Sequence, residues 1–165
     1  MFEKILSSID VSLKKHDIPY MIIGGQAVLL YGEPRLTRNI DITLKPLPKD
    51  LKSFVRQTMV LPALDETTGI RVDFIFSFTP YETEAINRSK KIKILNQEVN
   101  FASPEDLIIH KIFAGRPRDI EDVRTVLLKN PDIDVRYVRK WLKEFDLFSE
   151  KKEFLKTFEE VIKEI

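Results

Sequence analysis

The sequence predicts an α+β fold in which helices cover one face of a small β-sheet. Short β-type segments occur at 20–23, 39–44 and 70–78, amphipathic helical patterns separate them, and the last third of the chain contains only helical patterns. At 165 residues the chain has the length of one ordinary domain and can bury a sizeable core. We expect a core part at 1–102 and a helical C-terminal part at 103–165, packed together as one unit.

The composition is that of a folded protein without a dominant charge. Hydrophobic residues make up 43% of the chain and charged residues 32%, which separates it from disordered proteins. The formal net charge of +1 favours no general attraction to nucleic acid. The absence of cysteine excludes disulfides and thiolate zinc sites and favours a reducing environment. No apolar run approaches the roughly 20 residues of a membrane span, so we predict a cytoplasmic protein with no membrane partner.

The strongest functional signal is a pair of glycines after the first β-type segment. Gly24 and Gly25 allow a sharp turn and a close approach of the backbone to a ligand. Residues 26–31 then have a helical pattern, so unpaired N–H groups and the positive end of a helix dipole would face the turn. A phosphate group suits this environment, although most Gly-Gly pairs are simple turns.

Two later strands each carry an aspartate on their polar face. In residues 39–44 apolar and polar side chains alternate strictly, and the polar face carries Asn39, Asp41 and Thr43. The segment 70–78 repeats this pattern and places Asp73 opposite its apolar row. Because aspartate is disfavoured in strands, both residues need a reason. We expect their carboxylates to lie side by side at the glycine turn.

The order of these motifs resembles the polymerase-β-type nucleotidyltransferase superfamily, and within it the small prokaryotic AbiEii-type proteins. The motifs that carry the resemblance are Gly24-Gly25, Tyr31-Gly32, Arg35-x-Thr37, Asn39-Ile40-Asp41-Ile42, Asp73, and Ser103 to Leu107 followed by Lys111, Ala114, Arg116 and Asp119. Several motifs in the same order along the chain identify a family more specifically than any single motif does. The resemblance implies a small mixed β-sheet of nucleotidyltransferase type and a transferase that moves a nucleoside monophosphate from an NTP to an acceptor.

The resemblance also implies a site with a phosphate-binding turn, a pair of metal-binding carboxylates and a later basic residue. The implied nucleotide-binding residues are Gly24, Gly25, Arg35, Thr37, Lys111 and Asp119; the metal ligands are Asn39, Asp41 and Asp73; the catalytic residues are Asp41, Asp73 and Lys111. The metal would be magnesium, or Mn²⁺ in its place. The acceptor would be an RNA end, a protein or a small molecule.

Asn39 departs from the family pattern, which has the first carboxylate of an Asp-x-Asp pair at this position. An amide oxygen can ligate Mg²⁺ but brings no charge, and hard cations favour anionic oxygen. A second interpretation is therefore a non-catalytic nucleotide-binding protein or toxin-antitoxin component with an incomplete metal site. A third interpretation is a structural protein that binds a partner protein through its C-terminal helices.

Residues 103–106 have the pattern of a strong helix start, and Gly115 ends the predicted helix. Lys111 lies on an apolar stripe of this helix, so we expect its ammonium group at the rim, either extended towards water or in contact with phosphate. Asp119 has the pattern of an N-cap for the next helix, beside its implied nucleotide-site role. Asp122 is expected to be solvated.

The remaining elements are predicted from periodicity alone. They are helices at 2–16, 49–59, 81–88, 134–145 and 149–165, and a hairpin of 91–95 with 98–101 around Asn96-Gln97. The aromatic residues of the last two helices are interpreted as core or as a partner-facing surface.

Overall fold

The computed structural model describes residues 1–34, 36–44, 59–150 and 153–165. The strands of these residues are β1 (Tyr20–Ile23), β2 (Asn39–Leu44), β3 (Val60–Asp65), β4 (Ile70–Phe76), β5 (Lys90–Ile94) and β6 (Gln97–Phe101). Their helices are α1 (Phe2–Lys15), α2 (Gly24–Tyr31), α4 (Pro80–Asn87), α5 (Pro104–Ala114), α6 (Pro117–Lys129), α7 (Val135–Leu147) and α8 (Phe154–Lys163). The described strands form one mixed sheet in the order β3-β4-β2-β1-β6-β5. The predicted α+β class with a mixed sheet is confirmed.

Backbone contacts divide the chain into two compact units. The first unit consists of 1–26 and 36–103 and contains the sheet with α1 and α4. The second unit consists of 27–35 and 104–165 and contains α5 to α8. Helix α2 begins in the first unit and continues in the second. The expected packing of a core part and a helical part into one unit stays a prediction.

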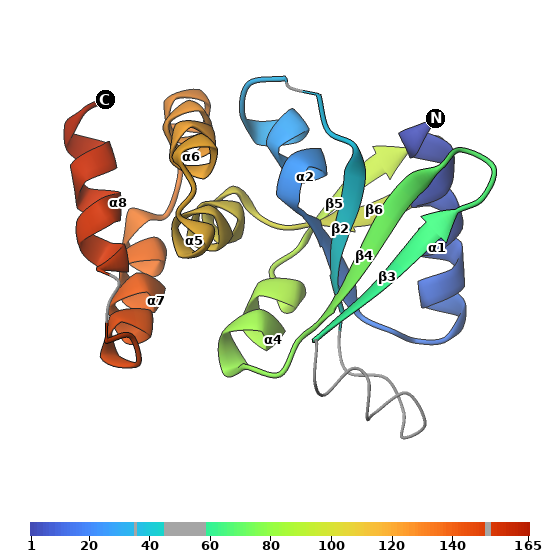
Figure 1. Ribbon diagram of the computed structural model, residues 1–165, viewed down its shortest axis with the longest axis horizontal. Coiled ribbons are helices and arrows are strands. Elements are labelled where there is room, and N and C mark those ends of the chain that lie inside the picture. The colour runs from blue at the N-terminus through green and yellow to red at the C-terminus, as the bar shows by residue number, and fades with distance from the viewer. Residues whose placement is uncertain (35, 45–58, 151–152) are drawn as a thin grey trace. The chain divides into compact units, whose positions relative to one another are not determined.

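The apolar face of the central strands forms the core of the first unit. Ile40 of β2 pairs with Val72 of β4, and Ile42 pairs with Phe74, so these side chains share one face. Three of the four are buried, and Phe74 is half-buried. Figure 1 shows β4 between β2 and β3. This hydrophobic row leaves the alternate positions of both strands for the polar face.

Helix α1 is tied to the sheet by a buried polar contact. The carboxylate of Asp10 accepts hydrogen bonds from the Tyr20 hydroxyl at 2.5 Å and from the Lys14 ammonium at 2.9 Å. Lys14 also donates to the main-chain oxygen of Glu98 in β6 at 2.8 Å. Burial, together with the bond to Asp10, raises the pKa of Tyr20, so its hydroxyl keeps its proton. The predicted amphipathic N-terminal helix therefore packs as expected.

Strand β3 was not predicted, and its sequence explains why. It contains Pro62, which cannot donate a hydrogen bond, and it pairs only with β4 at the edge of the sheet, where proline is tolerated. The predicted hairpin is present as β5 and β6. Its turn is at Leu95 and Asn96, with a positive φ of 54° at Leu95. Arg35 and residues 49–58 of the predicted covering helix lie outside the described residues.

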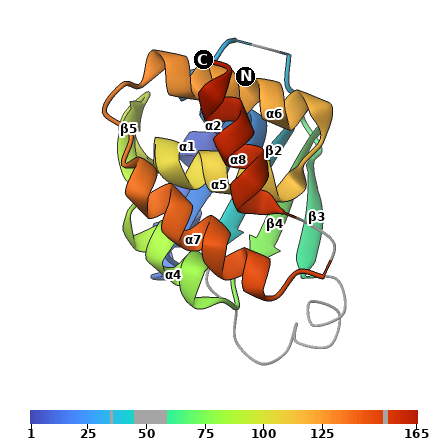
Figure 2. The ribbon, with the colours of Figure 1, turned by 90° about the vertical axis from the view of Figure 1, so that its left-hand side faces the viewer.

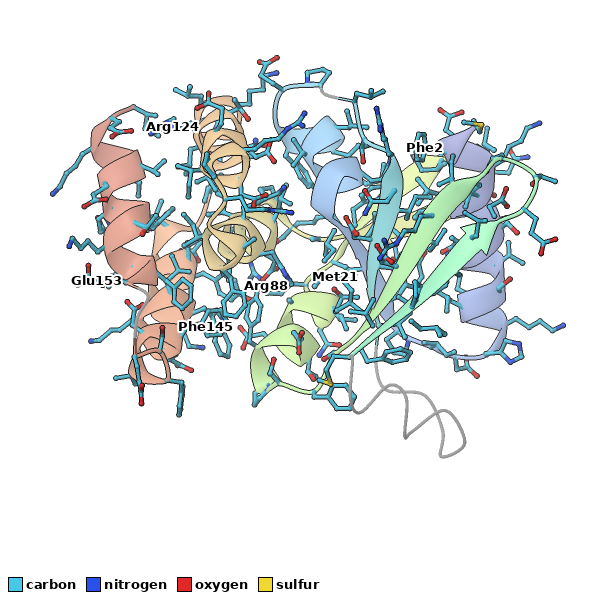
Figure 3. All side chains as sticks on the ribbon, in the orientation of Figure 1. Phe2, Met21, Arg88, Arg124, Phe145 and Glu153 are labelled. Carbon is cyan, nitrogen blue, oxygen red and sulfur yellow. The ribbon has the colours of Figure 1, made fainter. Side chains whose placement is uncertain are left out.

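The second unit is built on aromatic contacts between its helices. Phe113 of α5 stacks on Phe154 of α8 with ring centroids 5.2 Å apart, and Phe145 of α7 contacts both rings edge-on. Phe145 is labelled in Figure 3, and Figure 2 shows α7 and α8 beside α5. Among the aromatic residues of the last two helices, Tyr137, Trp141, Phe154 and Phe158 are buried, as the core interpretation predicts, whereas Phe148 at the C-cap of α7 is exposed. None of the described helices is long and apolar enough to cross a bilayer.

Candidate functional site

The glycine turn at the start of α2 is in direct contact with two side chains of the predicted site. Gly24 has a positive φ of 64°, and a Cβ at this position would lie 2.1 Å from Oδ2 of Asp41. A Cβ at Gly25 would lie 2.5 Å from Oγ1 of Thr37. Both distances are far below van der Waals contact, so each glycine is needed to seat the acidic residue or the threonine.

The polar faces of β2 and β4 bring together four side chains, which we call the β2–β4 cluster: Asn39, Asp41, Arg71 and Asp73. The parallel register pairs Asp41 with Asp73 and Asn39 with Arg71. Within β2, Nδ2 of Asn39 donates to Oδ1 of Asp41 at 2.8 Å. Within β4, Nε of Arg71 donates to Oδ1 of Asp73 at 2.7 Å. The register thus places Asp41 and Asp73 side by side on neighbouring strands, as predicted, and Asp41 lies at the glycine turn.

Apolar residues of the outer neighbouring strands flank the two carboxylates on either side. Ile23 of β1 lies opposite Asp41, and Pro62 of β3 lies opposite Asp73. The side chain of Asp73 is 11% exposed, whereas that of Arg71 is 61% exposed. The carboxylates are therefore partly removed from water, which strengthens their interaction with any cation that reaches them.

The cluster fits one divalent cation. Two adjacent carboxylates and an amide are hard oxygen donors of the type that Mg²⁺ and Mn²⁺ prefer, and two anions balance one such ion. Across the described parts of the chain, no group of three or more His, Asp and Glu side chains could hold a metal ion. At the position where the resemblance implies a further carboxylate, this chain has the neutral amide of Asn39.

Sequence reasoning missed two residues of this region, Gln26 and Arg71. Gln26 follows the glycine turn, is 6% exposed, and its buried Nε2 has no hydrogen-bond partner among the described residues. An unpaired buried donor is costly, and an anionic oxygen of a ligand would satisfy it. The available signals were a lone polar residue in an apolar helix and the alternation that places Arg71 on the face of Asp73.

A second charged cluster lies in the helical unit and corrects two predictions. Lys111 is 5% exposed and does not reach the rim of its helix. Its Nζ donates to Oδ1 of Asp119 at 2.9 Å and to Oδ2 of Asp122 at 2.7 Å. The prediction that Asp122 is solvated is therefore wrong, because this carboxylate is buried against the ammonium group. Helical spacing predicted the apolar stripe but not the acidic partners from α6.

The predicted N-cap role of Asp119 is also wrong. Helix α6 begins at Pro117, Arg116 occupies the N-cap position, and Asp119 is the third helical residue. The Asp119 carboxylate accepts hydrogen bonds from the Arg116 main-chain nitrogen at 3.3 Å and from its guanidinium Nε at 2.5 Å. Proline favours the first helical position, which moves the start of the helix two residues earlier.

The charge state of Asp119 follows from these contacts. Burial alone would raise the pKa of its carboxyl, but hydrogen bonds from Arg116 and Lys111 hold that pKa below its ordinary value of 3.8. A lowered pKa in the folded state stabilises the fold above the ordinary pKa. That contribution is lost as the pH falls through the lowered value, so this unit should be sensitive to acid only well below neutral pH.

Comparison with known families places this geometry in context. A family described as "Nucleotidyltransferase of unknown function (DUF6036)" matches residues 2–165. The chain belongs to this family. The predicted relationship to nucleotidyltransferases is thus confirmed, whereas the AbiEii-type likeness has no support from these matches. A comparison with curated proteins finds no significant match.

Solved nucleotidyltransferase structures share the fold of this family member. An antigenic nucleotidyltransferase-like protein from Paracoccidioides brasiliensis is 16% identical, with a TM-score of 0.58 over 98% of this chain and 87% of that chain. The antibiotic-resistance factor ANT(2'')-Ia in solution is 18% identical, with a TM-score of 0.53 over 87% and 90%. Its crystal structure with adenylyl-2''-tobramycin is 17% identical, with a TM-score of 0.50 over 86% and 97%. At these identities, the likeness shows the fold alone.

The predicted site residues of this nucleotidyltransferase-family chain fall into two groups. Those in the sheet unit are Gly24, Gly25, Thr37, Asn39, Asp41 and Asp73, and contacts connect them around the glycine turn. Lys111 and Asp119 are bonded to each other in the helical unit. The roles assigned to these residues in nucleotide and metal binding stay predictions.

Gly24→Ala should unfold the sheet unit more easily than Gly69→Ala. Both glycines have positive φ, so each substitution costs about 1 to 3 kcal/mol of backbone strain. Only Gly24 adds a clash, because nothing lies within 4 Å of a Cβ at Gly69. Urea unfolding should give Gly24→Ala the larger loss of unfolding free energy by at least about 1 kcal/mol. Equal losses would mean that Asp41 moves away from the turn freely.

Lys111→Met should destabilise the helical unit by about 3 to 5 kcal/mol, because it removes the buried ammonium group that Asp119 and Asp122 share. The matched control is Lys156→Met, which removes an exposed lysine paired with Glu153 at 2.7 Å and should change stability by about 1 kcal/mol or less. Urea unfolding followed by circular dichroism measures both. If the two variants lose the same stability, Lys111 is not a structural ion in this unit.

Proposed function

We propose that this protein transfers a nucleoside monophosphate from an NTP to an acceptor hydroxyl, with Mg²⁺ or Mn²⁺ held by Asp41 and Asp73. The observation that carries the proposal is the β2–β4 register, which sets Asp73 beside Asp41 at a glycine turn in a chain of a nucleotidyltransferase family. The turn leads directly into α2, whose first N–H groups suit phosphate.

Each group of the site has a proposed task. The bound ion supplies positive charge that neutralises and orients phosphate oxygens. Gln26 would donate its unpaired amide hydrogen to a phosphate oxygen, as its burial without a partner favours. The acceptor oxygen forms a bond to the α-phosphorus while the bond to the β-phosphate oxygen breaks, so pyrophosphate leaves. The hydroxyl proton passes to a carboxylate of the β2–β4 cluster.

Roles for Lys111, Asp119, Thr37 and Arg35 in nucleotide binding are part of the same proposal. Within the helical unit, Lys111 donates to both Asp119 and Asp122, so any part that it plays in nucleotide binding would depend on this ion-pair cluster. Asp119 would act by holding this ammonium group in place. Thr37 contacts the glycine turn and bonds the Asn39 main-chain oxygen at 3.2 Å, which suits a supporting role.

The acceptor class is part of the proposal. RNA ends, proteins and small molecules all offer hydroxyl groups. The complex of ANT(2'')-Ia with adenylyl-2''-tobramycin is a property of that protein, and it makes small molecules the first acceptor class to test here. A cytoplasmic location also stays a prediction.

A second candidate function is nucleotide binding without transfer, as in a sensor or a toxin-antitoxin component. The observation that favours it is the contact within β2, where Asn39 directs an amide N–H towards Asp41 instead of offering an anionic oxygen to a metal. An AbiEii-type relationship and a protein partner on the C-terminal helices would belong to this alternative.

A labelling experiment tests the transferase proposal. The full chain is incubated with each α-labelled NTP, Mn²⁺ or Mg²⁺, and RNA ends, cell-extract proteins or small-molecule hydroxyl compounds. We expect label on one acceptor class and a loss of at least about 100-fold in Asp73→Asn, because the metal ligand is removed. Asp17→Asn, an exposed aspartate with a φ of 51°, is the control and should keep full activity. Undiminished transfer by Asp73→Asn would refute the proposed site.

Asn39→Asp should strengthen metal binding and lower stability without metal. The substitution replaces a hydrogen-bond donor to Asp41 by a third carboxylate, so we expect a loss of about 1 kcal/mol in EDTA. Melting temperature should then rise more with Mg²⁺ than in the wild type. Asn96→Asp, in the exposed hairpin turn, makes the same charge change outside the site. If the wild type already transfers NMP at a rate that Asn39→Asp does not improve, the sensor alternative should be dropped.

A further inference from the structure

We propose that Arg71 is a resident counter-ion of the metal site. Its guanidinium group holds Asp73 until a divalent cation displaces it, and it then contacts the phosphates of the nucleotide. This inference rests on the proposed function, because it concerns the same site. It assigns a positioning role to a residue that the family resemblance did not include.

The first observation is the contact between Arg71 and Asp73. Nε of Arg71 donates to Oδ1 of Asp73 at 2.7 Å, and the two residues share a face because they are two positions apart on β4. The carboxylate is nearly buried, with 11% of its side chain exposed. A carboxylate so placed needs a positive partner, and among the residues described here that partner is Arg71.

The second observation is the difference between the two ends of this ion pair. The Arg71 side chain is 61% exposed, so its charged head can leave Asp73 without entering a dehydrated environment. Its neighbours across the sheet are Asn39 of β2 and Leu64 of β3, and both are uncharged. Neither of these two neighbours would hold the guanidinium after it leaves Asp73. A phosphate group would, because arginine binds phosphate oxygens in a planar, two-point contact.

The third observation is the barrier that Arg71 sets to a metal ion at Asp73. A cation approaching Asp73 must displace a guanidinium. The metal alone should therefore bind weakly, and a nucleotide should improve metal binding because it offers Arg71 a new anionic partner. Such mutual strengthening is reciprocal, so the metal should also improve nucleotide binding.

The test measures the binding affinities for Mn²⁺ and for nucleotides separately, without an activity assay. In calorimetric or electron paramagnetic resonance titrations with Mn²⁺ alone, Arg71→Gln should bind about 10-fold more tightly than the wild type. In EDTA, the same variant should bind ATP, GTP, CTP or UTP about 10-fold more weakly, whichever the wild type binds. Lys91→Gln is the control. It removes one positive charge from the exposed pair with Glu98 at 3.7 Å and should change neither affinity.

A second pair of variants keeps the inference testable if Arg71→Gln folds poorly. Asp73→Asn should abolish Mn²⁺ binding and free the guanidinium, so metal-free NTP binding should become tighter. The double variant Arg71→Gln/Asp73→Asn should lose that gain, since the arginine that provides it is absent.

The inference is supported if Arg71→Gln binds Mn²⁺ more tightly and NTP more weakly than the wild type. It is overturned if Arg71→Gln leaves the Mn²⁺ affinity unchanged or lowers it, or if neither protein binds Mn²⁺. A failure of label transfer combined with the expected Mn²⁺ and NTP changes would remove the transferase proposal and keep the role of Arg71. Normal label transfer by the wild type, together with unchanged Mn²⁺ and NTP affinities in Arg71→Gln, would keep the transferase proposal and remove the role of Arg71.

Discussion

The parallel register between β2 and β4 is the constraint on which the candidate site depends. Because side chains alternate along each strand, this register places Asp41 and Asp73 at the same level on one face, and Asp41 lies next to Gly24. A shift of one residue would exchange Asp73 with an apolar neighbour such as Val72 and bury its carboxylate in the core. The hydrophobic row therefore fixes the acidic row, and the glycine turn can close on it only because a Cβ is absent.

Two neighbouring carboxylates require compensation, and the two units of the chain provide it differently. In the helical unit, Asp119 and Asp122 both accept from the ammonium of Lys111, which is almost fully buried and could leave only by breaking two buried ion pairs. In the sheet unit, Asp73 is paired with Arg71, whose head remains largely in water. A buried lysine suits a permanent structural ion, whereas an exposed arginine suits an exchangeable one.

Periodicity predicted the elements that have strong local patterns. The alternation at 39–44 gave the correct faces of β2, and the proline with acidic residues after Ser103 gave the correct start of α5. Strand β3 was missed because its proline opposes a strand unless the segment lies at a sheet edge, which only the tertiary fold decides. The burial of Asp122 was missed because its partner, Lys111, lies on a different helix, and no local pattern contains that contact.

Formal charge connects the departure at Asn39 with the role inferred for Arg71. With Asn39 neutral, the β2–β4 cluster carries two negative charges and one positive charge, which leaves a net charge of minus one. One divalent ion changes that net charge to plus one, which attracts an anionic triphosphate, and a second ion would leave an excess positive charge that this donor set does not balance. A third carboxylate would shift the balance towards two ions and make a local guanidinium less necessary. The amide at position 39 and the arginine at position 71 are therefore consistent with a site that takes one cation together with its nucleotide.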